Sequence, residues 1–458
     1  MLQFFGVGGV QMLFIKSKRA MSLSIAFLFI SLSSLVLAQK PDMSKQQKIA
    51  GYDLSICPGQ APDILTMALI LDRAIQCSPD LSAYRLEHEM IVADRVIAGQ
   101  RPNPNLTLGA DSLNSHPSQS SRTSQKVDST VRIDQLIELG GKAKYRIDAA
   151  TNAELASKYF LRYAEKEIIT AIQQIFYDGL SAQQKEKDLY EIVEMNKKVS
   201  EVAVIRFKSG DISKMEYNKI ILDVSRTENE YKNAKSDLLK AKETIAKALA
   251  FNQSINKTTF APDWPNHNDD LPVIPWERIS KRNDLQAFKS KTQSAEASRN
   301  FARSLKVPDV TVGLQYNHLP VTGSPQNSTI NTYLVNFTIP LFVRHQYQGE
   351  SMRAEAEYYK ARDMQVRAER DALIAIELRE AEVRNNQEKL NRMLLSILPS
   401  AEQTASAAEF AYSKGAIGVL DVIDSRRSLR QVRTEASQIR ADFAKSLNAL
   451  KLATFIEE

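Results

Sequence analysis

The most regular pattern of apolar and polar positions lies between Tyr412 and Leu450. It opens with a turn around Gly415 and continues as one long helical pattern. Its apolar residues form two seams with a seven-residue repeat, which is typical of helices packed as a coiled coil. The seams are Leu429, Ala436, Phe443 and Leu450, with Val432 and Ile439 between them. The polar positions are expected on the exposed face: Arg426, Arg427, Arg430, Gln431, Arg433, Glu435, Arg440 and Lys445.

The same pattern occurs earlier in the chain. Residues Phe207–Ile212 align with Tyr412–Ile417 at an offset of 205, so Gly210 matches Gly415. A heptad follows there too, at Val224, Tyr231, Leu238 and Ile245. A glycine turn that joins two long helices and occurs twice indicates an internal duplication.

Between the helical patterns the period changes to two, which predicts β-strands. The predicted strands cover about 104–113 and 127–137 in the first half, and about 308–317 and 329–340 in the second. Polar loops at 116–124 and 318–328 separate the strands of each pair. Pro308 repeats Pro104 at an offset of 204.

Each half therefore reads helix, strand, strand, long helix, glycine turn, long helix. The first repeat covers 61–250, a Pro-rich linker covers 251–281, and the second repeat covers 282–458. The second repeat is expected to contain a very long helix from about Gln346 to Ala411. The fold class is mainly α with a membrane β-barrel contribution. Four strands cannot close a barrel, and an open sheet in lipid leaves backbone groups unpaired. We therefore expect a trimeric, 12-stranded barrel, continued by an α-helical coiled-coil tunnel.

The N-terminus predicts export. Basic residues precede an apolar run from Met21 to Leu37, and Ala38 offers a cleavage point, so 1–38 is expected to be a signal peptide. Met12 as the start would give a signal of normal length. The alternative, a membrane anchor, needs roughly twenty apolar residues, and the run is shorter. A polar segment, 39–60, follows.

Export places the chain's two cysteines, Cys57 and Cys77, in an oxidising compartment. There they could form a disulfide between the mature N-terminus and the first helix. Two separate thiols remain the alternative, and the sequence does not decide between them.

Charge and composition exclude several functions. The net charge of +6 comes from basic residues interleaved with acidic ones along helical patterns, which is typical of solvated helix faces. No cluster of arginines and aromatics of the kind that binds nucleic acid is present. The five histidines have no metal-ligand spacing, and the sequence contains neither a phosphate-binding glycine loop nor a nucleophile elbow. We expect no enzyme activity, no cofactor, no metal site and no nucleic-acid partner.

Three motifs carry a resemblance to the TolC family of outer-membrane efflux proteins: Gln135–Lys142, Thr338–Phe342 and Tyr412–Asp424. The resemblance covers about Ala61–Thr454, and Glu138–Lys142 looks most like the branch that serves heavy-metal and cation pumps. It implies a homotrimeric channel-tunnel in the outer membrane and periplasm of a Gram-negative bacterium, in contact with lipid. It also implies a periplasmic adaptor and an inner-membrane transporter of the resistance-nodulation-division type.

The resemblance also implies site residues. Asp421 and Asp424, with Glu216 from the first repeat, fall at the family's pore constriction, and Ile417 replaces a basic residue that often follows the second glycine turn. The periplasmic tip falls on Ser209, Gly210, Lys414 and Gly415. For Asp421 and Asp424 the alternative is a purely local role, in which they complement the positive N-terminal end of their helix.

Two other functions remain open. A secreted coiled-coil scaffold or adhesin would have the same helices, but it would not need strand pairs at matching places in both halves. An outlet for type I protein secretion would have the same barrel and tunnel. The sequence does not identify the exported substrate, which could be a metal cation, a drug or a protein.

Overall fold

The computed structural model describes residues 57, 62–111, 127–251, 255–320 and 329–455. The expected signal peptide, most of the polar segment 39–60 and the loop at 116–124 lie outside these residues. So does most of the loop at 318–328. Among the described residues, no helix combines the length and apolarity needed to cross a membrane.

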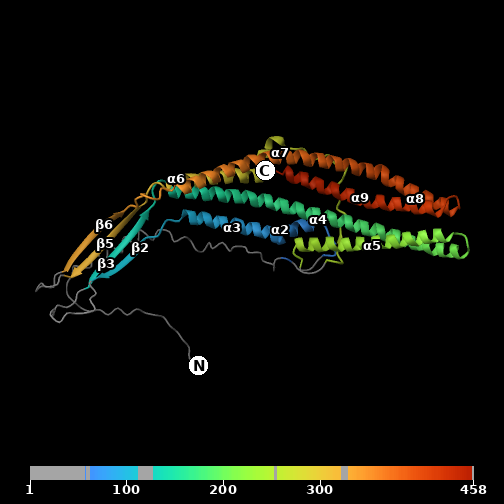
Figure 1. Ribbon diagram of the computed structural model, residues 1–458, viewed down its shortest axis with the longest axis horizontal. Coiled ribbons are helices and arrows are strands. Elements are labelled where there is room, and N and C mark those ends of the chain that lie inside the picture. The colour runs from blue at the N-terminus through green and yellow to red at the C-terminus, as the bar shows by residue number, and fades with distance from the viewer. Residues whose placement is uncertain (1–56, 58–61, 112–126, 252–254, 321–328, 456–458) are drawn as a thin grey trace, which may run out of the picture. The chain divides into compact units, whose positions relative to one another are not determined.

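The two halves of the described chain repeat one order of elements (Figure 1). The first half contains α3 (Pro79–Gly99), β2 (Asn105–Asp111), β3 (Asp128–Ile137), α4 (Lys142–Lys208) and α5 (Lys214–Ala248). The second contains α6 (Asn283–Ser304), β5 (Val310–Pro320), β6 (Thr329–Thr338), α7 (Gln348–Arg392), η4 (Met393–Ile397), α8 (Leu398–Ser413) and α9 (Val419–Ala453).

The four long strands form one antiparallel sheet in the order β2-β3-β5-β6. The register places Leu108 beside Val131, Val131 beside Tyr316, and Tyr316 beside Tyr333, so these side chains share one face. That face carries exposed apolar residues, including Leu106, Leu108, Ile133, Leu314, Val335 and Phe337. The other face carries mainly polar residues, such as Thr107, Arg132 and Gln315. β2 and β6 are the two edges of the sheet.

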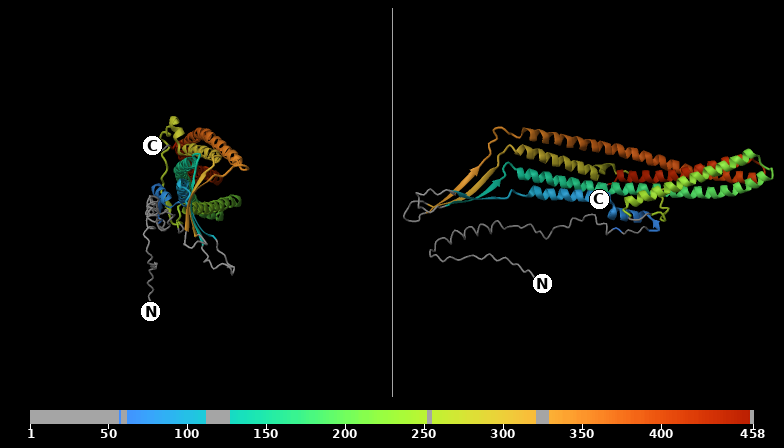
Figure 2. Two further views of the ribbon diagram at one scale, coloured as in Figure 1. Left: turned by 90° about the vertical axis from the view of Figure 1, so that its left-hand side faces the viewer. Right: turned by 60° about the horizontal axis from the view of Figure 1, so that its bottom comes forward.

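The helices next to the sheet follow the same order as the strands. α3 packs on α4, α4 on α6, and α6 on α7, and Figure 2 shows these helices running alongside one another. α3 and α7 are therefore the edges of this layer. The edge helix α7 exposes apolar residues at seven-residue spacing, namely Met352, Tyr359, Val366 and Leu373.

The largest apolar core lies where the first residues of the described chain cross the long helices. The short strand β1 (Ile64–Leu65) pairs in parallel with β4 (Thr259–Phe260) from the linker. Helix α2 (Met67–Cys77) follows β1, and Arg73 donates to the carbonyl oxygens of Leu249 and Ala250. We call residues 57 and 62–77 the clasp. Its Leu65, Ile70 and Ala74 pack against Phe176, Leu180, Ile245, Phe260, Ala441 and Ala444.

A disulfide between Cys57 and Cys77 links the two ends of the clasp, and the Cα atoms of these cysteines are 5.8 Å apart. Cys77 is the last residue of α2, and both cysteines are buried. The disulfide therefore fixes residue 57 at the point where α2 ends and α3 begins.

Two expectations about elements were wrong. The helix expected from about Gln346 to Ala411 is interrupted by the π-helical segment η4, where the Leu398 N–H bonds to the Met393 carbonyl oxygen. Pro399 follows immediately and has no N–H, so the regular α-helical bonding cannot pass through it. The loop expected from His318 begins later, because β5 continues to Pro320.

Candidate functional site

The two glycine turns have the same backbone geometry. Gly210 has φ 83° and Gly415 has φ 77°, values that favour glycine. After each glycine the next N–H bonds back to the helix: Asp211 to Arg206 and Ala416 to Ala411, both at 2.9 Å. A Cβ at either glycine would meet open space, so backbone conformation and not crowding requires glycine here.

Ser209 and Lys414 precede these glycines, and both are exposed. Each is the C-terminal cap of its helix, Ser209 for α4 and Lys414 for α8. The Ser209 hydroxyl donates to the Ile205 and Arg206 carbonyl oxygens, which satisfies the helix end locally. The Lys414 ammonium lies over the Phe410 ring. Both turns thus present accessible side chains beyond well-bonded helix ends.

Glu216 and Asp421 occupy matching positions at the starts of α5 and α9. The Glu216 carboxylate accepts from the Ser213 N–H at 2.8 Å and from its hydroxyl at 2.9 Å, while Ser213 Oγ accepts from the Glu216 N–H. These hydrogen bonds favour the ionised carboxylate and lower the pKa of Glu216. The Asp421 carboxylate accepts from the Gly418 N–H at 3.2 Å. Both residues stabilise the first turn of their helix.

Asp424 has a different environment. Its side chain is 74% exposed, and its nearest cation is Arg427, 3.7 Å away on the same helix. Within the described chain, no hydrogen bond or ion pair joins Glu216 to Asp421 or Asp424. The structure therefore gives the local helix-end role to Glu216 and Asp421, whereas the exposed Asp424 pairs only with Arg427 among the described residues.

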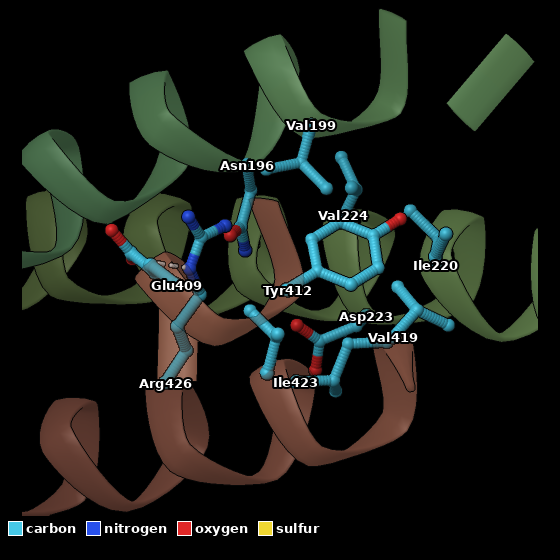
Figure 3. Close-up of a pocket in the computed structure, with 11 residues that line it drawn as sticks. Asn196, Val199, Ile220, Asp223, Val224, Glu409, Tyr412, Val419, Ile423 and Arg426 are labelled. Carbon is cyan, nitrogen blue, oxygen red and sulfur yellow. Dashed lines mark hydrogen bonds and ion pairs between the residues drawn. The ribbon is translucent and has the colours of Figure 1, made fainter. Parts of the chain in front are cut away.

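An apolar contact joins the α4/α5 hairpin to the α8/α9 hairpin close to the turns. Its buried centre is Ala203, Ile220 and Val419. Figure 3 shows the Tyr412 ring lying among Val224, Ile220, Val419 and Ile423. A cavity of about 90 Å³ remains beside the ring, so the packing here is incomplete.

Polar contacts between the two hairpins lie beside this apolar contact. The Arg206 guanidinium donates to the Tyr412 hydroxyl at 2.6 Å. Arg427 lies 3.4 Å from the Asp223 carboxylate. Arg430 donates to the Thr227 hydroxyl at 2.6 Å and lies 3.1 Å from Glu230. We call these contacts the hairpin lock: Arg206–Tyr412, Asp223–Arg427, and Arg430 with Thr227 and Glu230.

The hairpin lock corrects one expectation from the sequence. Arg430 was expected on the exposed face of the coiled coil, but only 9% of it is exposed, and its partner Thr227 is fully buried. The sequence contains a clue to this arrangement. Asp223 and Thr227 follow Ile220 by three and seven residues, the spacing of a buried helix seam. Polar residues at seam positions need buried partners, and cations on the facing helix supply them.

Basic residues supply the polar contacts of the hairpin lock. They are Arg427 and Arg430 on α9 and Arg206 on α4. Farther along α9, Arg433 and Lys445 also pair with carboxylates on α4. Arg426 instead pairs with Glu409 at 2.8 Å inside the α8/α9 hairpin, as Figure 3 shows. In the described part of the chain, no cluster of three or more His, Cys, Asp or Glu residues could hold a metal ion.

Comparison with known proteins identifies relatives along nearly the whole chain. The family model described as "Outer membrane efflux protein" matches residues 70–250 and 276–454. The cobalt-zinc-cadmium resistance protein CzcC of Cupriavidus metallidurans is 26% identical over 423 residues, which is 89% of this chain and 94% of CzcC. The pyoverdine export outer membrane protein OpmQ of Pseudomonas putida is 22% identical over 403 residues, 82% of this chain and 83% of OpmQ.

Solved structures share the fold. The Campylobacter jejuni CmeC outer membrane channel superposes with a TM-score of 0.72 at 16% identity, covering 85% of each chain. At this identity the likeness concerns the fold.

Proposed function

This chain belongs to the outer membrane efflux protein family, and from that premise we propose that three copies form a channel that conducts metal cations out of the cell. Proteins of this family are outer-membrane channels of tripartite efflux systems, which also contain a periplasmic adaptor and an inner-membrane pump, and they are not enzymes. The protein is therefore an outer-membrane efflux channel of a Gram-negative bacterium, with a tunnel in the periplasm.

The observation that carries the trimer is the pair of unpaired edges on a two-faced sheet. β2 and β6 have no neighbour on their outer sides within the described chain, and the helix layer ends in α3 and α7 in the same order. Unpaired strand edges are unstable in lipid, because no water is present there to form hydrogen bonds with their N–H and C=O groups. Three copies placed edge to edge would supply twelve strands, an even number in the range of outer-membrane barrels.

The two faces of the sheet support its orientation in that barrel. Exposed Leu108, Leu314, Val335 and Phe337 would face lipid, and the polar face with Thr107 and Gln315 would line the lumen. The helices would then continue the wall into the periplasm. The glycine turns, at the far end of the helices from the sheet in Figure 1, would meet the adaptor.

The constriction belongs near the same turns. Around a threefold axis Asp424 would form a ring of exposed carboxylates, one helical turn from a second ring of Asp421. Such acidic rings favour cations in pores. The hairpin lock would hold this end narrow, because separating the hairpins breaks the hydrogen bond of Arg430 to Thr227 and the ion pair of Arg427 with Asp223.

The proposed substrate follows from the acidic constriction together with the relatives. CzcC is named for cobalt, zinc and cadmium resistance and matches this chain over a longer span, at a higher identity, than the pyoverdine exporter OpmQ. We place the channel with a pump of the resistance-nodulation-division type. Export of a siderophore, or of a protein through a type I system, is the competing function.

Growth of a deletion strain tests this proposal. We expect deletion to lower the tolerated concentrations of zinc, cobalt or cadmium several-fold, and expression of the wild-type chain to restore them. Intracellular metal measured by mass spectrometry should rise in the deletion strain. Unchanged metal content and tolerance, combined with loss of a secreted siderophore or protein, would contradict the metal assignment and support the competing function.

A further inference from the structure

We propose that the boundary between the sheet and the long helices binds the phosphate groups of anionic glycerophospholipids. This inference rests on the proposed function, because helices in the periplasm place that boundary at the inner leaflet of the outer membrane. Glycerophospholipids make up that leaflet. The binding groups are exposed cations, Arg344 and Lys306, that lie beside exposed apolar residues and have no ionic partner in the described chain.

The segment between β6 and α7 combines apolar and basic side chains. Leu341 is 82% exposed and Val343 is 78% exposed, and Arg344 follows them directly. Arg344 is itself exposed, and within the described residues its guanidinium forms no hydrogen bond or ion pair. An apolar surface that ends in an unpaired arginine is suited to the depth at which acyl chains meet headgroups.

A cavity of about 480 Å³ lies beside Arg344. His345, Glu350 and Arg353 also line it. The Glu350 carboxylate lies 3.0 Å from His345, and Arg353 lies 2.9 Å from Glu357. The charged groups around the cavity therefore pair with one another and leave Arg344 without an anion.

The matching corner of the first repeat has the opposite charge at this position. Gly141 and Tyr347, which are 206 residues apart, directly precede α4 and α7 and both have positive φ, 74° and 55°. At the same spacing Arg344 corresponds to Glu138, whose carboxylate forms an ion pair with Arg146. The first corner therefore neutralises its own charge. Arg344 needs an anion that the described chain does not supply.

The first corner is also filled, whereas the second is open. Lys142 is only 5% exposed, and its ammonium donates to the Val307 carbonyl oxygen at 2.6 Å and to the Asp309 carboxylate at 2.7 Å. The corresponding residue of the second corner is Gln348, which is exposed and lines the cavity. The second corner thus has space for a ligand group where the first holds a buried side chain.

A second unpaired cation lies between α6 and β5. Lys306 is exposed, and its ammonium has no hydrogen bond or ion pair among the described residues. The next residue, Val307, is 40% exposed. Leu139 is also 40% exposed, and its N–H donates to Asp309 in the same segment. Here too a cation lies beside exposed apolar side chains.

The far end of the sheet carries the opposite charge. Asp111 and Asp128 are paired residues at that end of β2 and β3. The described residues there, 110–111, 127–129, 318–320 and 329–331, include no lysine or arginine. Figure 1 shows that the boundary with the helices is the other end of these strands. The unpaired cations therefore mark the end of the sheet that would meet the inner leaflet.

The arrangement favours a lipid over a soluble anion. A guanidinium or ammonium group forms charge-assisted hydrogen bonds with phosphate oxygens, whether the phosphate is free or esterified. Only a lipid would also use the exposed Leu341 and Val343, because its acyl chains cover apolar surface beside the headgroup. We therefore assign the phosphate to a glycerophospholipid.

Lipid retention by the purified full-length protein tests this assignment. Protein in a neutral detergent is mixed with phosphatidylglycerol, and native mass spectrometry counts the lipids retained per assembly. Arg344→Gln combined with Lys306→Gln should retain several-fold less phosphatidylglycerol than wild type. Phosphatidylcholine, whose positive choline compensates its phosphate, should be retained weakly and equally by both proteins.

The matched control is Arg362→Gln combined with Lys289→Gln. It removes the same two charges from exposed positions about 20 Å along α7 and α6. This control should retain as much phosphatidylglycerol as wild type. Equal retention by wild type and the Arg344/Lys306 variant would overturn the proposal. An equal loss in the control would also overturn it, because net charge alone would then govern retention.

A competition experiment separates a lipid from a free anion. Inorganic phosphate, compared with chloride at equal ionic strength, should not displace phosphatidylglycerol from wild type. Displacement by phosphate would identify a site for soluble anions and overturn the lipid assignment. Loss of the trimeric mass in the Arg344/Lys306 variant, with unchanged lipid retention per chain, would instead assign these cations to a contact between subunits. A monomeric mass of the wild-type protein would remove the proposed trimer itself.

Discussion

At the scale of single residues, the hairpin lock is the most unusual feature, because it buries charge at the contact between two hairpins. Arg430 is 9% exposed and Asp223 is 7% exposed. Charged groups are rarely buried unless they are paired, and removing one partner leaves the other desolvated. The stability of this end of the molecule should therefore depend strongly on a few side chains.

Arg430→Met should weaken the contact between the hairpins. The substitution leaves the buried Thr227 hydroxyl and the nearby Glu230 without their cation, a loss of about 2–4 kcal/mol by analogy with other buried charged hydrogen bonds. We expect the single-channel conductance in planar bilayers to rise several-fold. The matched control, Arg370→Met, removes an exposed pair with Asp371 and should leave the conductance unchanged. A conductance equal to wild type in Arg430→Met would show that the lock does not hold the channel narrow.

Asp424→Asn should weaken cation selectivity in planar-bilayer recordings and reduce block by multivalent cations. The reason is that its exposed carboxylate would contribute to the acidic ring without capping a helix. Asp421→Asn should add to the loss of selectivity, but it should also lower thermal stability, because Asp421 accepts from the Gly418 N–H. If the double substitution lowered thermal stability and left selectivity and block at the parental values, the helix-end role would be the correct one.

The acidic residues could be identified from the sequence, but their roles in capping a helix or facing a pore could not. Glu216 and Asp421 occupy matching places after the two glycine turns, and the sequence alone cannot separate capping from facing a pore. In the structure both carboxylates accept a backbone N–H, from Ser213 and Gly418, and their position at a pore stays a prediction. Arg430 was wrongly expected on the exposed face because a heptad pattern assigns polar residues to the solvent side. A buried arginine that binds a partner on another helix does not follow that rule.

At the scale of elements, the clasp ties together helices that belong to different parts of the chain. Its residues pack on α4, on the end of α5 and on α9, and Arg73 binds the carbonyl oxygens where α5 gives way to the linker. The pairing of β1 with β4 was not predicted, because each strand has two residues and two residues carry no periodic pattern.

Removing the disulfide should lower the stability of the clasp. Cys57 and Cys77 are separated by 20 residues in the sequence, and a closed loop of that size contributes about 3 kcal/mol in the chain-entropy view. We expect the double variant Cys57→Ser with Cys77→Ser to have a lower melting temperature than wild type. Its melting temperature should equal that of wild type in a thiol reductant. The reductant should have no further effect on the double variant. If the reductant did not change the melting temperature of the wild-type protein, the disulfide would have no stabilising role.

The glycine turns are the elements expected to meet the adaptor. They end well-bonded helices and expose Ser209 and Lys414. Ser209→Cys and Lys414→Cys should each crosslink to the adaptor in cells. The control is Thr329→Cys, at the exposed start of β6, which should not crosslink. Crosslinking from Thr329→Cys alone would invert the orientation of the channel.

The long elements could be predicted from the sequence and the short interruptions could not. Heptads over many turns identified the helices, and alternation identified the four strands to within a few residues. The segment η4 was missed because Met393–Ile397 is itself a good helical sequence. Only Pro399 marked the break, and a proline near the start of a helix is also a common and stable arrangement.

At the scale of the whole molecule, duplication explains why a single chain is incomplete. The second strand of each repeat needs the first strand of another repeat beside it. Inside the chain β5 meets that need for β3, and nothing in the described chain meets it for β6. The duplication and the family could be predicted from the sequence, and the match to the outer membrane efflux protein family confirms the family.

The mass of the purified protein in detergent tests the central claim most directly. Light scattering, corrected for bound detergent, should give three times the mass of the mature chain, because three copies would close a twelve-stranded barrel with no sheet edge unpaired. A stable species with the mass of one chain would contradict the account, since a lone chain would then tolerate the open edges of β2 and β6 in a membrane environment.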